Sequence, residues 1–284
     1  MSQYRVLLCT DMDRTVIPNG AQIESEQARA RFSLLCQRPE VCLVYVTGRH
    51  KQLVQEAINQ HALPLPSYAI TDVGTKIYQI NDGQWQTLDS WDDEMKKGWS
   101  GRGHAHIKYL LDDVAQLSLQ EEGKQSTYKL SYYLPLHADV KTLLPEMQAF
   151  LKKQAIDASL VWSIDEEKAV GLLDVLPRNA SKLHAIEFLQ AHLKYQRDEV
   201  IFAGDSGNDL EVLASDIAAI LVANASQEIK YEAECLALQS GHESTLYTAK
   251  GGRLNMNGNY SAGVLEGVWH YSPALRGVIE SSEN

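Results

Sequence analysis

The chain has few cysteines, no long apolar run and no excess of positive charge. Its four cysteines, Cys9, Cys36, Cys42 and Cys235, show no CxxC spacing, so we interpret them as buried thiols in a reducing compartment. No run approaches the roughly 18 to 20 apolar residues that a membrane helix needs, and the N-terminus lacks the basic start and cleavage site of a secretory signal. We therefore expect a cytoplasmic protein with no membrane partner.

The charge balance excludes a second class of partner. The 284 residues carry 26 lysines and arginines against 37 aspartates and glutamates, for a net charge of -11. Proteins that bind nucleic acid need a basic footprint for the phosphate backbone, so we expect no nucleic-acid partner. A small phosphorylated substrate remains compatible, because local cations and a bound metal decide its binding.

Acidic residues gather in two short clusters. Asp11 and Asp13 follow the apolar run 4–9, and Asp205 and Asp209 follow the apolar run 199–203. Carboxylates held close together repel and raise each other's pKa, unless a divalent cation lies among them. The clusters therefore predict a metal site.

The first part of the chain alternates strand and helix patterns. Strands are expected at 4–10, 41–46 and 68–71, helices at 25–37 and 51–60, and a hairpin through 76–80. This order is typical of βαβ units, in which ligands bind beyond the carboxyl ends of the strands. Thr47, Gly48 and Arg49 follow the second strand, so they are expected at that edge with the aspartates.

A different pattern begins near residue 89. Residues 89–173 read as helices and antiparallel strands, and the helix 137–154 has apolar residues at helical spacing. Beyond Pro177 the alternating pattern resumes, and the tail from about Arg276 to Asn284 is expected to fray. We predict an α/β fold, a Rossmann-like parallel-sheet core (1–88 and 174–284) with an inserted α+β cap domain (89–173).

The first aspartate cluster suits phosphoryl transfer. A carboxylate can attack phosphorus when a metal offsets the repulsion between two anions. Asp11 and Asp13, two residues apart, could supply the nucleophile and a general acid/base. Thr47, Lys182 and loop amides could bind the phosphoryl oxygens, since positioning and charge neutralisation do most of the catalytic work.

Four segments together resemble the motifs of the haloacid dehalogenase superfamily, in their usual order. They are Asp11-Met12-Asp13-Arg14-Thr15, Thr47-Gly48-Arg49, Lys182, and Gly204-Asp205-Ser206-Gly207-Asn208-Asp209. The resemblance spans the chain, and it implies that the insertion between the threonine and lysine motifs is a C2-type cap.

The same resemblance implies roles for these residues. Asp11 would be the nucleophile that forms an aspartyl-phosphate, and Asp13 the acid that protonates the leaving oxygen and then activates water. The implied phosphate ligands are Thr47, Gly48, Lys182 and Asn208. The implied Mg²⁺ ligands are Asp11, the main-chain carbonyl of Asp13, Asp205 and, as a further or more distant ligand, Asp209.

A narrower likeness concerns the substrate. Segments 72–78, 128–133, 173–177 and 258–267 resemble the sucrose-phosphate phosphatases of plants and cyanobacteria, which implies sucrose 6-phosphate as substrate. The implied sugar-binding residues are Lys129 and Asp174, with Lys168 and Arg49 as weaker candidates. The chain departs from that family at Arg14, where glycine or asparagine is usual, and at 164–171, which read IDEEKAVG.

Three alternatives remain open at this point. The substrate could be another glycosyl or hexose phosphate, such as mannosylglycerate phosphate, because relatives share the core and differ in the cap. The enzyme could have a sugar-phosphate synthase as a partner. In a different class, the chain could be a noncatalytic module docked on a glycosyltransferase, although such a module has no physical need for a repulsive acidic cluster.

Overall fold

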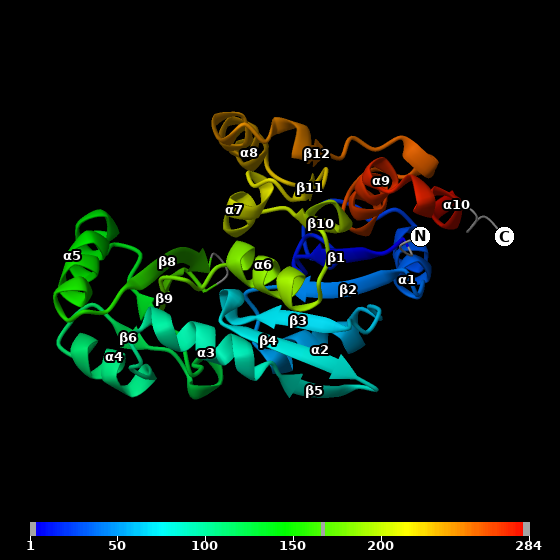
Figure 1. Ribbon diagram of the computed structural model, residues 1–284. Helices are drawn as coiled ribbons and strands as arrows, with labels where there is room; N and C mark the ends of the chain where they lie inside the picture. The colour runs from blue at the N-terminus through cyan, green and yellow to red at the C-terminus, as the bar shows by residue number, and fades with distance from the viewer. Residues whose placement is uncertain (1–3, 166–167, 281–284) are drawn as a thin grey trace.

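A computed structural model describes residues 4–165 and 168–280, and its strands form two separate sheets (Figure 1). The larger sheet has the order β12-β11-β10-β1-β2-β3-β4-β5. From β12 to β3 neighbouring strands are parallel, and β4 and β5 continue the sheet antiparallel. Its strands are β1 (Val6–Thr10), β2 (Val41–Val46), β3 (Tyr68–Thr71), β4 (Lys76–Asn81), β5 (Gln84–Thr87), β10 (Val200–Gly204), β11 (Ala218–Leu221) and β12 (Leu246–Thr248).

Apolar side chains of the central strands pack on both faces of this sheet. In β1, Leu7 and Cys9 belong to one hydrophobic cluster, whereas Val6 and Leu8 belong to another. Burial on both faces explains why β1 reads as a continuous apolar run rather than an alternating one. The covering helices are α1 (Ala28–Cys36), α2 (Lys51–Gln60), α6 (Lys182–His192), α7 (Leu210–Leu213), α8 (Gln227–Ser240), α9 (Ser261–Tyr271) and α10 (Arg276–Glu280).

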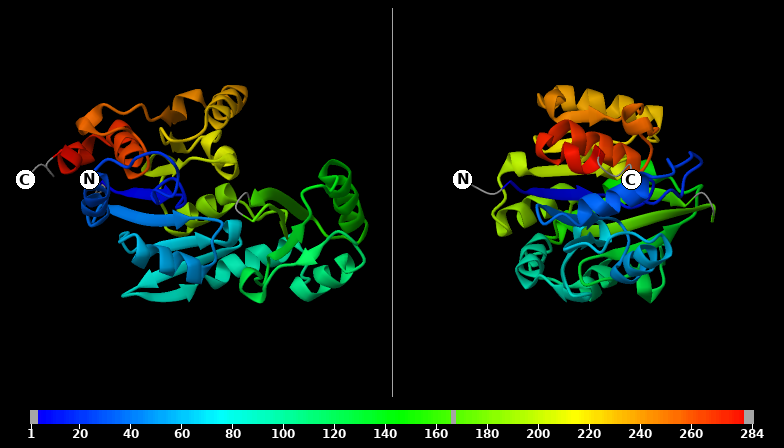
Figure 2. Two further views of the ribbon diagram at one scale, coloured as in Figure 1. Left: turned by 180° about the vertical axis from the view of Figure 1, so that it is seen from behind. Right: turned by 90° about the vertical axis from the view of Figure 1, so that its right-hand side faces the viewer.

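The smaller sheet lies to one side of the core, where it forms a second lobe together with the helices that connect its strands to the core and to one another (Figures 1 and 2). Its order is β6-β7-β9-β8, and every neighbouring pair is antiparallel. The elements are α3 (Asp89–Gly98), α4 (His104–Leu111), β6 (Ser118–Leu119), β7 (Leu130–Leu134), α5 (Val140–Lys153), β8 (Ala158–Asp165) and β9 (Val170–Pro177). The predicted fold class, a parallel-sheet α/β core with an inserted α+β part, is confirmed.

Helix α3 contacts both lobes. Near its start, Trp91 is fully buried, packs 4.8 Å from the ring of Phe188 in α6, and donates from Nε1 to the carbonyl of Gly74 at 3.1 Å. Just after its last residue, Trp99 packs 6.1 Å from the ring of Tyr128, close to β7. The helix therefore connects the core to the second lobe along its whole length.

Several elements differ from the sequence expectations. The short strands β5, β6 and β12 and the helix α9 were not expected. The expected fraying is wrong for 276–280, which form α10 with Ile279 buried; residues 281–284 lie outside the described part of the chain. The boundary expected between 173 and 174 falls within β9, and the division into core and cap stays a prediction.

All four cysteines are free thiols, with Cys9 buried and the others half-buried. Within the described ranges, none of the helices has both the length and the hydropathy that crossing a bilayer demands.

Candidate active site

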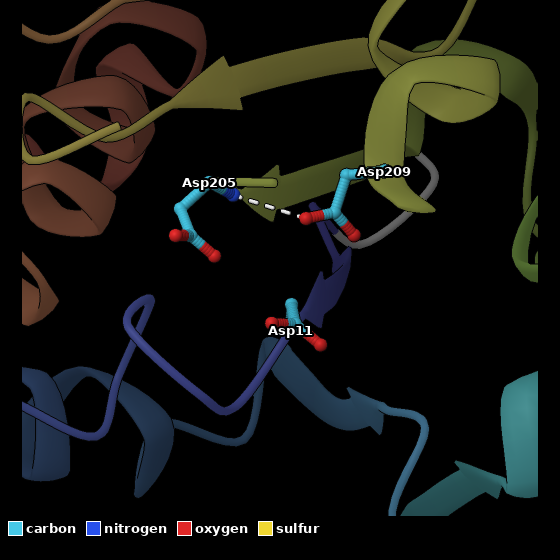
Figure 3. Close-up of side chains that lie close together, drawn as sticks. All are labelled: Asp11, Asp205 and Asp209. Carbon is cyan, nitrogen blue, oxygen red and sulfur yellow. Dashed lines mark hydrogen bonds between the residues drawn. The ribbon is translucent and has the colours of Figure 1, made fainter. Parts of the chain in front are cut away.

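Strand pairing brings the two aspartate clusters together. β1 and β10 are parallel neighbours with Thr10 opposite Ala203, and the pairing continues as the amide of Asp11 donates to the carbonyl of Ala203 at 2.8 Å. Asp11 and Asp205 each come directly after one of these strands. Their carboxylates therefore lie at the same edge of the sheet, where Figure 3 shows them facing a common space.

Asp209 is the third member of this group. One carboxylate oxygen from each of Asp11, Asp205 and Asp209 lies within 4.8 Å of the other two, and all three residues are buried. Asp209 Oδ2 accepts from the backbone amides of Asp205 and Ser206 at 3.0 and 3.1 Å. Glycine at 204 makes this approach possible, because a Cβ there would lie 2.5 Å from Asp209 Cγ.

Lys182 neutralises part of the acidic cluster. Its buried ammonium donates to Asp11 Oδ1 at 2.8 Å, to Asp209 Oδ1 at 2.7 Å and to Asn208 Oδ1 at 3.0 Å. An ammonium has three donors, so these bonds use all of them. Lys182 begins α6, where the Ser181 hydroxyl accepts the amide of His184 and so caps the helix.

Burial dominates the ionisation of the cluster. It raises the pKa of Asp11 above its ordinary value, against the nearby charge of Lys182. Burial, together with the charge of Asp209, raises the pKa of Asp205 to about 6, although Arg14 opposes the shift. For Lys182, burial lowers the pKa, but the charges of Asp11 and Asp209 outweigh it and raise the pKa overall. A divalent cation among Asp11, Asp205 and Asp209 would reduce the repulsion between their carboxylates.

Asp13 lies apart from the three clustered carboxylates. Arg49 grips it with two bonds, Nε to Oδ2 and Nη2 to Oδ1, each 2.7 Å long, and the Asn19 amide donates to Oδ1 at 2.7 Å. Burial would raise the pKa of Asp13, but the hydrogen bonds and charge of Arg49 outweigh it, so the pKa is lowered. No motif of the sequence marked Asn19 as part of the site.

Thr47, Gly48 and Asn208 border the space above Asp11. The Thr47 hydroxyl oxygen accepts the amide of Arg49 at 3.2 Å, which leaves its own proton directed elsewhere. Asn208 presents Oδ1 to Lys182 and to the Ser206 hydroxyl, so its amide nitrogen remains to donate to a ligand. Both groups suit the oxygens of a phosphoryl group.

A cavity of about 730 Å³ opens between the two lobes at this point. The volume is within the range of about 300 to 1,000 Å³ that small-molecule sites occupy. From the core it is lined by Asp11, Asp13, Arg14, Thr47, Gly48, Arg49 and Asn208, among others; from the second lobe it is lined by Gln120, Lys124, Lys129, Val161, Ser163, Leu172 and Asp174, among others.

The structure brings most of the predicted sugar-binding residues to this cavity. Lys129, Asp174 and Arg49 line it. Lys168 is exposed beside the turn between β8 and β9, and it is not among the described residues of the lining. Its assignment stays a prediction.

Arg14 contacts the acidic cluster directly. Its Nε lies 3.2 Å from Asp205 Oδ2, its backbone adopts the left-handed region with φ of 57°, and its carbonyl accepts from Asn224 at 2.6 Å. The sequence marked Arg14 as a departure from the family, but the partner, 191 residues away, was not predictable from local pattern. Arg14 thus adds a cation at the mouth of the site.

The donor set fits a hard divalent cation. Mg²⁺ is bound through oxygen ligands, commonly one or two carboxylates together with a phosphate. Asp11 and Asp205 supply such oxygens. Asp209 has both oxygens engaged by Lys182 and by backbone amides, so it serves to position the site.

The fold, with an Asp-x-Asp motif after the end of β1 and a buried lysine and an acidic loop beside it, defines a haloacid dehalogenase-like phosphatase. Within that class, the chain belongs to the sucrose-6F-phosphate phosphohydrolase family, whose model matches residues 4–272.

Individual relatives agree with this placement. The chain is 50% identical to a HAD-like hydrolase of Nitrosococcus oceani over 279 residues, which cover 98% of this chain and 75% of that protein. It is 30% identical to a mannosylfructose-phosphate phosphatase of Agrobacterium fabrum over 224 residues, 78% of this chain and 85% of the relative. The sucrose-phosphatase of Synechocystis sp. PCC6803, solved with sucrose and phosphate, has the same fold: the TM-score is 0.72 at 24% identity, covering 95% and 98% of the two chains.

Proposed function

We propose that this protein is a Mg²⁺-dependent phosphatase that hydrolyses sucrose 6-phosphate to sucrose and phosphate. The observation that carries the proposal is the position of Asp11. Its carboxylate is buried beside Lys182 and Asp205 and lines a cavity whose opposite wall comes from the second lobe. A phosphate bound over Asp11 would direct its sugar toward that wall.

The first step forms a covalent intermediate on the protein. A carboxylate oxygen of Asp11 attacks phosphorus, and the bond between phosphorus and the sugar oxygen breaks. Asp13 gives its proton to that leaving oxygen, so free sugar departs and Asp11 carries the phosphoryl group. Thr47, the Gly48 amide and Asn208 hold the phosphoryl oxygens during the transfer, and Lys182 joins them by exchanging one of its three bonds for a phosphoryl oxygen.

The second step regenerates the enzyme. Asp13, now a carboxylate, takes a proton from a water molecule whose oxygen attacks phosphorus, and the bond to Asp11 breaks. Inorganic phosphate leaves, and Asp13 again holds the proton. Mg²⁺, held by Asp11, the Asp13 carbonyl and Asp205 with Asp209 behind them, would neutralise charge on the transferring phosphoryl group.

We also propose the division of labour between the lobes. Residues 1–88 and 174–284 act as the catalytic core, and residues 89–173 as a C2-type cap that determines the substrate and excludes water. In the cap, Lys129 and Asp174 are the proposed sugar contacts. A cytoplasmic location and a sugar-phosphate synthase partner stay predictions.

A second candidate substrate is a mannosylfructose phosphate. The 30% identity to a mannosylfructose-phosphate phosphatase favours it. This is one form of the broader alternative, a glycosyl phosphate other than sucrose 6-phosphate, of which mannosylglycerate phosphate is another. A noncatalytic role has no such support, because the charged cluster is intact.

Phosphate release from a panel of substrates tests the assignment. The panel contains sucrose 6-phosphate, a mannosylfructose phosphate, mannosylglycerate phosphate and glucose 6-phosphate, each assayed with Mg²⁺ and with excess chelator. We expect the highest kcat/KM with sucrose 6-phosphate and loss of turnover with the chelator. Preference for a monosaccharide phosphate would overturn the substrate, and full activity in chelator would overturn the metal.

Replacing the nucleophile tests the mechanism. Asp11→Asn keeps the shape of the side chain but removes the attacking carboxylate, so we expect turnover to fall by at least about a thousandfold. The thermal midpoint should change little or rise, because the substitution removes a buried charge. Retained turnover would show that the nucleophile lies elsewhere.

A further inference from the structure

One charged contact joins the two lobes beside the cavity. Lys129, just before β7 of the second lobe, has its ammonium 4.0 Å from Oδ1 of Asp72, which follows β3 of the core. The same ammonium lies 3.9 Å from Oδ2 of Asp174 in β9. The side chains of Lys129 and Asp72 are 10% and 4% exposed, so the contact is largely removed from solvent.

Within the described residues, the charged atoms of this contact lack hydrogen-bond partners. Among the described residues, the Lys129 ammonium has no acceptor within hydrogen-bond distance, although two carboxylates lie within 4 Å. Asp72 Oδ1 is buried and, within the described part of the chain, has no hydrogen-bond partner, while Oδ2 accepts the Thr71 hydroxyl at 2.9 Å. A buried acceptor left unpaired is costly, so the nearby charge of Lys129 matters to Asp72 Oδ1. Lys129 itself lines the cavity, and its ammonium keeps its donors for a ligand there.

Strand register shows which way Lys129 faces. In the smaller sheet, Ser131 of β7 pairs with Asp174 of β9, and Tyr133 of β7 pairs with Leu172 of β9. Asp174 and Leu172 both line the cavity. Lys129 shares the parity of Ser131 and therefore the same face. Lys129 lines the cavity, whereas Asp72 is not among the residues that line it.

The turn that carries Asp72 is fixed to the phosphate-binding loop. The amide of Asp72 donates to the carbonyl of Arg49 at 3.0 Å, and the amide of Val73 donates to the carbonyl of Thr47 at 3.3 Å. Asp72 and Val73 both adopt left-handed backbone, with φ of 52° and 58°, which is uncommon for residues other than glycine. The Asp72 carboxylate is thus held at a set distance from the site of chemistry.

We infer that Asp72 is a positioning residue for substrate specificity: from the core, it holds the ammonium of Lys129 at the cavity wall, where the ammonium donates to a hydroxyl of the substrate's sugar. The inference rests on the proposed function, because it assigns Lys129 to the sugar. Asp174 contributes the second carboxylate, and its Oδ1 is itself held by the Ser131 hydroxyl. Asp72 makes the cap's sugar contact depend on the position of the core.

Asp72→Asn is the direct test. Asparagine has the same size and tolerates left-handed backbone, so the change removes the charge and leaves the turn. We expect KM for the preferred sugar phosphate to rise about tenfold, since hydrogen bonds to charged groups are worth about that factor or more, with kcat changed by less than about twofold. Asp82→Asn, in the exposed turn between β4 and β5, is the matched control.

An aryl phosphate separates positioning from a merely structural role. p-Nitrophenyl phosphate has no sugar hydroxyl, so the ratio of kcat/KM for the sugar phosphate over the aryl phosphate should fall about tenfold in Asp72→Asn. If Asp72 only supports the loop of Thr47, both substrates lose activity equally and the ratio is unchanged. That result would overturn the inference.

A double-mutant cycle tests whether Asp72 acts through Lys129. Lys129→Met should raise KM at least as much as Asp72→Asn, and adding the second substitution should cost little more. Lys153→Met, on the exposed face of α5, serves as the control for the lysine change. Additive effects of Asp72→Asn and Lys129→Met would show that the two residues act independently.

The outcomes also separate this inference from the proposed function. If the unmodified protein hydrolyses p-nitrophenyl phosphate but no sugar phosphate, the proposed function fails. If it hydrolyses a sugar phosphate and Asp72→Asn keeps its KM, the proposed function survives and only the role of Asp72 is lost.

Discussion

The ion pair between Asp13 and Arg49 holds the proposed general acid in its ionised form. Arg49 bonds both oxygens of Asp13 and lowers its pKa, whereas an acid that protonates a leaving group near neutral pH needs a pKa close to the working pH. Under the proposed mechanism, the bonds from Arg49 to Asp13 would loosen when a substrate binds. Arg49 lines the cavity, so a substrate oxygen that draws the guanidinium away would also prepare Asp13 for proton transfer.

Arg14 supplies a first prediction. Its guanidinium lies 3.2 Å from Asp205, a proposed metal ligand, so it competes with a cation for that carboxylate. Asparagine keeps the left-handed backbone accessible, and we expect Arg14→Asn to strengthen Mg²⁺ binding about two- to fivefold, the range of an exposed ion pair. Isothermal titration with Mg²⁺ measures the effect.

The control for this prediction is Arg38→Asn, which breaks the surface pair with Glu40 at 3.3 Å. It should leave Mg²⁺ affinity as it is. Weaker Mg²⁺ binding in Arg14→Asn would mean that Arg14 supports the metal site instead of competing with it.

The turn Asp72–Gly74 connects three parts of the site. It bonds the loop of Thr47, holds Asp72 toward Lys129, and at Gly74 packs against the residue before Lys182. A Cβ at Gly74, where φ is 90°, would lie 2.5 Å from the carbonyl oxygen of Ser181. Backbone at the start of α6 cannot move without moving Lys182.

Gly74→Ala and Gly83→Ala form a matched pair. Both glycines have left-handed backbone, which costs alanine about 1 to 2 kcal/mol, but only Gly74 has a neighbour to clash with. We expect Gly83→Ala to lose about 1 to 2 kcal/mol of unfolding free energy and keep its activity. Gly74→Ala should lose about 2 to 5 kcal/mol, with the overpacking added, and most of its phosphatase activity.

Urea unfolding and p-nitrophenyl phosphate hydrolysis measure both effects. Equal losses in the two variants would mean that the contact with Ser181 relaxes at no cost, and that the turn does not position Lys182.

Helices and strands could be predicted from the sequence where their burial produces a clear pattern of apolar residues. The strands β1, β2 and β10 are buried on both faces and read as apolar runs, so their positions could be predicted. Helix α9 was missed because residues Ser261 to Val268 are all buried, which removes the polar face that gives a helix its periodicity. Strand β5 was missed because it is a polar edge strand.

The candidate site could be predicted where its residues belong to short motifs at the ends of strands or the start of a helix. Asp11, Thr47, Lys182 and Asp205 follow strand ends or begin a helix, so topology alone gathers them at one edge. The partners of Arg14 and Asp72 come from segments remote in sequence, and no local pattern could show them. Trp162, which pairs with Leu173 of β9, also lines the cavity, although no motif of the sequence marks it.

The clustered carboxylates couple overall stability to pH and metal. Without a bound metal, burial and mutual charge raise the pKa of Asp205 to about 6 and the pKa of Asp11 to about 8, both from an ordinary value of 3.8. The native state then binds more protons than the unfolded state, so the cluster's contribution to the free energy of unfolding falls as pH rises from about 4 to about 8. Under the proposed function, added Mg²⁺ would bind the ionised form of the cluster and offset this loss.

We therefore expect the Mg²⁺-induced rise in the thermal midpoint to be small at pH 5 and several degrees larger at pH 8. Scanning calorimetry with Mg²⁺ and with chelator measures it, and taking the difference cancels other titrating groups. Asp205→Asn should lose most of the Mg²⁺-induced rise in the thermal midpoint. An increment of equal size at both pH values would contradict the linkage.

The two tryptophans of helix α3 provide an intrinsic fluorescence probe of the relative position of the two lobes. The ring of Trp91 packs against Phe188 of the core, and the ring of Trp99 packs against Tyr128 of the second lobe. One continuous helix, α3, connects the two tryptophans. A movement of the lobes relative to each other would therefore disturb at least one of these ring contacts. If the proposed cap moves during turnover, native tryptophan emission should register the movement without any attached dye.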